Sequence, residues 1–179
     1  PMDPGTTQMA YSTSKTITVR QLLSHTAGIP NPIPLRWVHA ARLDAGVNEA
    51  AALQEVLRKH PRLSSEPGTK CAYSNIGYWL LGSVVARAAG RPFTRYVRER
   101  VLAPLGIAPE DLAYTIADPR RHAAGYLERW SLFNLMKGFL IDRAVIGPRY
   151  DDWIEIRPHQ LNGPAFGGLV GTARGFGTF

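Results

Sequence analysis

The stretch from Asn75 to Gly90 constrains the fold of this chain more than any other segment. Its apolar residues recur at the 3.6-residue spacing of one helix face. They are Ile76, Trp79, Leu80, Val84 and Ala88. Gly90 follows where a helix commonly ends in a left-handed cap. We therefore predict a helix over 75–89 that buries one face and begins just after Tyr73.

Further helices are predicted on both sides of this one. Asn48 caps a helix that runs to about His60. Pro92 suits the first turn of a helix that ends near Leu102. Residues 18–25 form a helical turn or two before Gly28, and Thr172 can cap a last helix.

The remaining segments read as loops and extended pieces. Residues 1–11 are a Pro- and Gly-rich loop, and a short helix is expected to start near Ser12. Residues 112–117 and 122–128 are candidate short strands, whereas 142–166 reads as loop-rich. The apolar stretch 130–141 is too short to span a bilayer and suits a core helix or one wall of a substrate cleft.

Composition is that of one globular domain. The chain has 179 residues, 45% hydrophobic and 20% charged, with a net charge of +7. Its basic residues are scattered without interleaved aromatics, so a solvated surface is favoured over nucleic-acid binding. No metal-ligand spacing occurs, and the single Cys71 is expected to be a small buried apolar residue.

Two short motifs together suggest nucleophilic catalysis. Ser12 and Lys15 are three residues apart, which on a helix places hydroxyl and ammonium on one face. Lys15 can remove the serine proton, directly or through the phenol of Tyr73. Asn75 offers an amide for a substrate carbonyl or for Lys15. The alternative is a capping serine with a solvated lysine, and a turn tyrosine followed by a helix-capping Asn75.

Ordered sequence blocks favour the catalytic interpretation. They are ITVRQLLSHTAGI at 17–29, PGTKCAYSNIGY at 67–78, GRPF at 90–93, PLGI at 104–107, and GGL with TAR at 167–174. Together with Ser-x-x-Lys they resemble the superfamily of serine β-lactamases and penicillin-binding proteins. The resemblance is to the branch of class C β-lactamases and family VIII carboxylesterases. It implies a structural role for His25 within the first block, although histidine is also a common general base.

The resemblance implies the mainly α portion of an α/β (α+β) β-lactamase/transpeptidase-like fold. Residues 1–179 would form a single partial domain, a helical subdomain with the flanking antiparallel sheet largely missing. Three family segments are not found: strands before Pro1, most of the nucleophile helix after Lys15, and a third motif of the Lys-Thr-Gly or His-x-Gly type. We expect a deletion, or a parent with further segments.

The function implied is that of a serine hydrolase acting through an acyl-enzyme on a small-molecule ester or amide. Ser12, Lys15 and Tyr73 would be catalytic, Asn75 would bind substrate, and neither cofactor nor metal is required. The Gly168 block and the 130–141 stretch lean toward esters. The alternative is a non-catalytic homologue or fragment that binds an acyl or peptide ligand. We expect no nucleic-acid partner and no membrane span, and the compartment and oligomeric state stay open.

Overall fold

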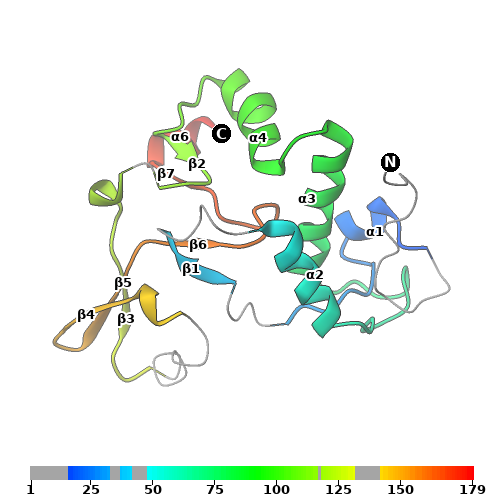
Figure 1. Cartoon of the computed structure of the whole chain (residues 1–179), viewed down its shortest axis with the longest axis horizontal. Helices are drawn as coiled ribbons and strands as arrows, with labels where there is room; N and C mark the ends of the chain where they lie inside the picture. The colour runs from blue at the N-terminus through cyan, green and yellow to red at the C-terminus, as the bar shows by residue number, and fades with distance from the viewer. Residues whose placement is uncertain (1–15, 33–36, 42–47, 117, 132–141) are drawn as a thin grey trace.

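The computed structural model describes residues 16–32, 37–41, 48–116, 118–131 and 142–179. Ser12, Lys15 and the helix predicted near them lie outside the described residues, as does 132–141 of the apolar stretch. No helix among the described residues is long and apolar enough to cross a membrane. Figure 1 shows a helical part, with α1, α2 and α3, and the strands β3, β4 and β5 at the opposite end of the long axis.

The helical part follows the sequence pattern closely. Helix α1 spans Val19–Leu23, α2 spans Glu49–Lys59 and α3 spans Asn75–Ala89. Their N-caps are Thr18, Asn48 and Ser74, and each side-chain oxygen accepts a backbone N–H of the first turn. Gly90 ends α3 in the left-handed conformation. The predicted helices over 75–89 and from Asn48 to His60 are therefore confirmed.

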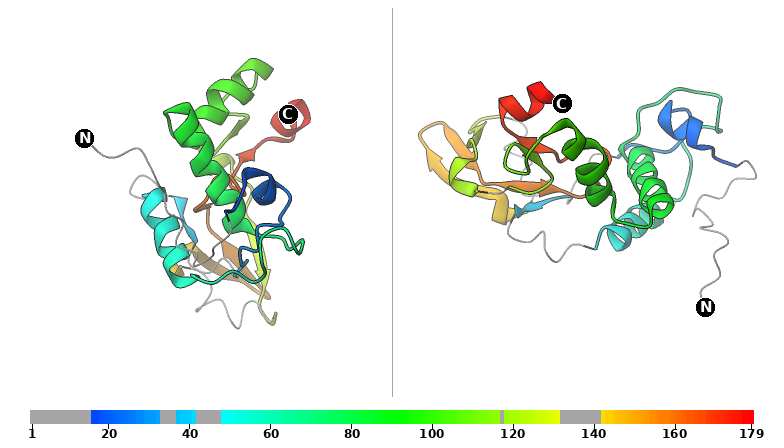
Figure 2. Two further views of the ribbon diagram at one scale, coloured as in Figure 1. Left: turned by 90° about the vertical axis from the view of Figure 1, so that its right-hand side faces the viewer. Right: turned by 90° about the horizontal axis from the view of Figure 1, so that it is seen from above.

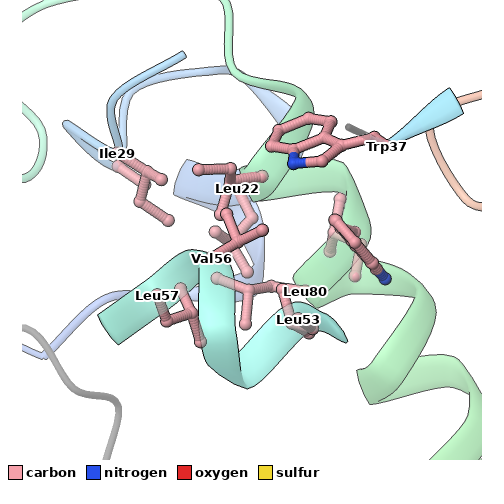
Figure 3. Close-up of a cluster of buried hydrophobic side chains, with 11 residues drawn as sticks. Leu22, Ile29, Trp37, Leu53, Val56, Leu57 and Leu80 are labelled. Carbon is pink, nitrogen blue, oxygen red and sulfur yellow. The ribbon is translucent and has the colours of Figure 1, made fainter. Parts of the chain in front are cut away.

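One apolar core joins these three helices (Figure 3). Leu22 of α1, Leu53 and Val56 of α2, and Ile76 and Leu80 of α3 are all buried in it. Three aromatic rings close one side of the core, with centroids 5.4 to 5.7 Å apart. These are Trp37, Trp79 and Phe166. Rings from three distant segments thus tie α3 to the C-terminal third of the chain.

A second, smaller core lies beyond the C-terminus of α3. Helix α4, Phe93–Val97, continues as a π-helical turn over Arg98–Leu102 and a 3₁₀ turn over Ala103–Leu105. Leu102, Ile107 and Leu112 are buried together there. The predicted helix from Pro92 to Leu102 is confirmed in extent, and its last turn is wider than an α-helical one.

The described strands form three small antiparallel sheets. Strand β1, Val38–Ala40, pairs with β6, His159–Leu161, and β2, Leu112–Ala113, pairs with β7, Val170–Gly171. The third sheet has the order β3–β5–β4, with bounds Gly125–Glu128, Trp153–Ile156 and Ile146–Tyr150. The right-hand view of Figure 2 shows this sheet at the end of the molecule opposite to α1, α2 and α3.

The prediction that 142–166 is loop-rich is wrong, because this range supplies β4, β5 and β6. Strand β4 contains Gly147 and Pro148, which are unusual in strands, and its register with β5 shifts between Ile146 and Arg149. The extended pieces near 112 and 125 are confirmed as β2 and β3. The resemblance also implied that a flanking sheet is largely missing, and that stays a prediction.

The last helix, α6, spans Ala173–Thr178 and has Thr172 as its N-cap, as predicted. Asp111 holds it in place from the start of β2. Its carboxylate accepts two hydrogen bonds from Arg174, at 2.8 and 2.9 Å, and one from the Thr172 hydroxyl at 3.1 Å. The Arg174 guanidinium holds the pKa of Asp111 below its usual range. Charge and geometry thus fix α6 against β2.

Candidate active site

Tyr73 stands at the N-terminal end of α3, on the loop that leads into the helix. Its side chain is 61% exposed, so the phenol faces solvent. The positive end of a 15-residue helix lies directly beside it. That end favours negative charge, such as the charge that develops on a carbonyl oxygen under attack. The position therefore suits proton transfer to a bound substrate.

His25 holds the Tyr73 loop from one side. Its backbone carbonyl accepts the Ala72 N–H at 2.8 Å, and its Nδ1 accepts the Ser74 N–H at 3.2 Å. The imidazole also lies between two phenol rings, with its centroid 4.6 Å from Tyr73 and 4.9 Å from Tyr78. Since Nδ1 accepts, the neutral ring carries its proton on Nε2. These contacts support the structural role expected for His25.

Backbone strain accompanies this role. His25 has a positive φ of 55°, a conformation that is uncommon for residues other than glycine. The left-handed turn brings both its carbonyl and its ring to the 72–74 segment. A residue with that backbone conformation, held by two hydrogen bonds, positions the neighbouring Tyr73.

Ser74 and Asn75 fix the same loop from the other side. The Ser74 hydroxyl donates to the Pro30 carbonyl at 3.1 Å and accepts the Gly77 N–H at 3.1 Å. The Asn75 N–H donates to the Asn31 side-chain oxygen at 3.0 Å. Segments more than forty residues apart in the chain thus place the first turn of α3.

The alternative in which Asn75 caps the helix is wrong. Ser74 is the N-cap, and Asn75 is the first residue of α3. Among the described residues, the Asn75 side-chain amide has no hydrogen-bond partner. Asn75 lies two residues after Tyr73 in the chain.

Cys71 departs from expectation because its side chain is exposed. Residues 71–74 lie outside any helix or strand, and their exposure differs from one residue to the next. Ser74 is buried while Tyr73 and Cys71 face out, and the Cys71 thiol lies 3.6 Å from the Ser24 carbonyl oxygen. Loop geometry therefore overrides the usual preference of a free cysteine for burial.

The structure thus brings together Tyr73 and Asn75 of the four predicted site residues, and Ser12 and Lys15 lie outside the part it describes. Two supporting residues were not predicted from the sequence: Asn31, and Tyr78, whose hydroxyl donates to the Leu23 carbonyl at 3.2 Å. Both residues lie close in sequence to the HTAG or YSN block. Their supporting role can be recognised only in the folded chain, where the two blocks are in contact. No group of three metal-ligating side chains occurs among the described residues.

Comparison with known proteins gives consistent likenesses. The family model described as Beta-lactamase matches residues 3–179. Beta-lactamase-like protein 2 of Dictyostelium discoideum is 33% identical over 104 residues, which are 58% of this chain and 18% of that protein.

Solved structures agree. D-amino acid amidase from Ochrobactrum anthropi SV3, complexed with D-phenylalanine, matches with TM-score 0.65 and 25% identity over 91% of this chain and 43% of that one. The beta-lactamase/D-alanine carboxypeptidase from Yersinia pestis, complexed with citrate, matches with TM-score 0.53 and 23% identity over 94% of this chain and 40% of that one. The chain spans less than half the length of these proteins, and the predicted β-lactamase/transpeptidase-like fold is confirmed.

Proposed function

Because this chain belongs to the beta-lactamase family, we propose that it is a serine hydrolase that forms an acyl-enzyme with a small ester or amide. The observation that carries the proposal is the exposed Tyr73 phenol, held by His25 and Ser74 at the start of α3. A proton-transfer group needs both a fixed position and access to substrate, and Tyr73 has both.

The proposed reaction has two stages. The Ser12 Oγ attacks the carbonyl carbon while Lys15 and Tyr73 together take its proton. The tetrahedral intermediate then collapses, the bond to the leaving group breaks, and Tyr73 returns the proton to the departing oxygen or nitrogen. Water attacks the acyl-enzyme by the same route and releases the acid and Ser12. Asn75 holds the acyl part of the substrate through its amide.

Two observations bear on the substrate class, one from the sequence and one from the structural relatives. The sequence leans toward esters, whereas the printed names of the structural relatives describe an amidase and a D-alanine carboxypeptidase. A panel with p-nitrophenyl butyrate, a chromogenic cephalosporin and D-phenylalanine amide separates an esterase, a β-lactamase and an amidase. We expect turnover of at least one of these by the purified chain.

Covalent labelling tests the mechanism directly. A fluorophosphonate probe is expected to add once, and mass spectrometry should place the adduct on Ser12. Ser12→Ala abolishes labelling and turnover, whereas Ser14→Ala in the same segment keeps both. Tyr73→Phe lowers turnover by at least about a hundredfold, the usual scale for a general acid–base group, and Tyr126→Phe is its matched control. An adduct on another residue, or turnover by the Ser12→Ala protein, would refute the mechanism.

A further inference from the structure

A cavity of about 360 Å³ lies beyond the C-terminal end of α3. Glu49 at the start of α2 lines it, and the Glu49 carboxylate accepts the Gly163 N–H at 2.9 Å. The other described walls come from α4, the Arg98–Leu102 turn, β2, β6 and the loop near Pro164 and Gly168. None of them belongs to the 24–31 or 71–78 segments that hold Tyr73. The volume is in the range of small-molecule sites, and the cavity lining does not include the segments that hold Tyr73.

One part of the cavity wall is apolar. It comprises Leu102, Ile107 and Leu112 of the small core, together with Leu161 of β6. Contact with an apolar ligand group in place of water lowers the free energy of such a surface. The cavity therefore suits a ligand with an aliphatic or aromatic body.

Gln160 supplies a buried polar group on the same cavity. Only 7% of this residue is exposed, and its Nε2 donates to the Tyr114 carbonyl at 3.2 Å. Its Oε1 is buried and has no hydrogen-bond partner among the described residues. A buried acceptor without a donor is costly, so a ligand N–H or O–H would relieve the cost. Burial raises the pKa of the Tyr114 phenol to about 12, so this neighbour stays neutral.

Arginines stand at the mouth of the cavity. Arg95 and Arg98 both line it, but they differ in their partners. The Glu99 carboxylate accepts from Arg91 and from Arg95 at 2.7 Å each, whereas the Arg98 guanidinium lies 3.8 Å from it. Arg98 therefore keeps donors that suit a ligand carboxylate.

We propose that this cavity binds a small carboxylate with an apolar body and one N–H donor, such as an N-acyl derivative of leucine. The apolar body contacts the leucine-rich wall, the N–H donates to Gln160 Oε1, and the carboxylate accepts from Arg98. Binding at this site breaks no bond, so it does not depend on the proposed hydrolysis.

Calorimetric titration of the whole chain with N-acetyl-leucine tests the site. We expect saturable one-to-one binding, unchanged in Ser12→Ala, which separates it from catalysis. N-acetyl-leucine methyl ester lacks the carboxylate, and 4-methylpentanoate lacks the N–H. Each is expected to bind about tenfold more weakly, the usual scale of one hydrogen bond to a buried or charged partner. Equal affinity for all three probes would overturn the assignment.

Variants locate the binding. Ala113→Leu fills the cavity and should abolish binding of N-acetyl-leucine. Arg98→Gln should weaken N-acetyl-leucine about fivefold with less effect on the methyl ester, whereas Arg100→Gln on the same turn changes nothing. Circular dichroism confirms that each variant is folded. Absence of saturable binding to the unaltered chain up to millimolar ligand, or full binding by Ala113→Leu, would refute the proposal.

Discussion

Aromatic residues pack into a core at one end of this molecule and are exposed at the other. In the helical part the buried rings of Trp37 and Trp79 meet the partly buried ring of Phe166. On the β3–β5–β4 sheet Tyr126, Tyr150 and Trp153 are each about half exposed. The buried rings join distant segments, whereas the exposed ones cover only their own sheet. The hydrogen bonds that hold the segment around Tyr73 come from residues 25, 30 and 31, which lie on the helical side of the molecule.

The largest effect should follow from truncating a ring in the buried cluster. Trp79 is 3% exposed, and Trp79→Ala removes its contacts with both other rings. We expect the free energy of unfolding to fall by about 3–5 kcal/mol. Trp153, 51% exposed, is the matched residue on the sheet, and Trp153→Ala should cost less than about 1 kcal/mol. Urea unfolding measures both, and equal losses would break the comparison.

A tight contact between α3 and the C-terminal third allows a second test. A Cβ at Gly82 would lie 2.5 Å from the Ala165 Cβ. Gly82→Ala gains helix propensity but overpacks this contact, and we expect a net loss of about 1–3 kcal/mol in thermal or urea unfolding.

Ala165→Gly in the Gly82→Ala background is the matched rescue. The pair should recover most of the lost stability, because one methyl group then replaces the other across the same contact. No recovery would mean that the two segments are not held by this packing.

The Tyr73 loop gives a third effect, of similar size. His25→Ala leaves the Ser74 N–H without its acceptor, and we expect a loss of about 1–3 kcal/mol in urea unfolding. His25→Asn should lose less, because asparagine tolerates the positive φ and offers a side-chain oxygen. Fluorophosphonate labelling should decline in the same order. Equal stability of the alanine variant would remove His25 from its positioning role.

The smallest effect concerns Asp111, whose pKa is lowered mainly by the hydrogen bond from Arg174. A carboxylate with a lowered pKa in the folded state stabilises the fold above its ordinary pKa of 3.8, and the contribution is lost as pH falls through the lower folded value. Asp111→Asn should therefore be slightly less stable than the parent at pH 7. The gap should narrow in urea titrations as the pH falls below 3.8, and a gap that widens in acid would contradict the ion pair.

Much of the helical part was predictable from sequence because its signals are local. Asn48, Gly90 and Thr172 are caps that act on their own helices, and the apolar face of α3 has a clear period. Strands β4 and β5 were missed, although β3 was predicted, because this sheet carries exposed side chains and β4 holds Gly147 and Pro148. Strand pairing there depends on tertiary contact, which a local pattern does not contain.

In the candidate site, too, local features could be predicted from the sequence and features that depend on tertiary contact could not. Tyr73 and Asn75 could be identified from a motif and from resemblance. The exposed thiol of Cys71 and the support from Asn31 could not, because each depends on the contact between two loops. A motif identifies the reacting groups, and the loop contact decides which way they face.

The segment from Cys71 to Ser74 places exposed and buried side chains in a fixed order. Cys71 and Tyr73 are exposed and Ser74 is buried, so the length of this segment sets which residue reaches solvent and which enters the core. One residue inserted before Ser74 and after Tyr73 would give the buried place to another side chain and shift the phenol by a step. The number of residues between the turn at Gly68 and the start of α3 therefore matters for the position of the phenol as much as the presence of the phenol does.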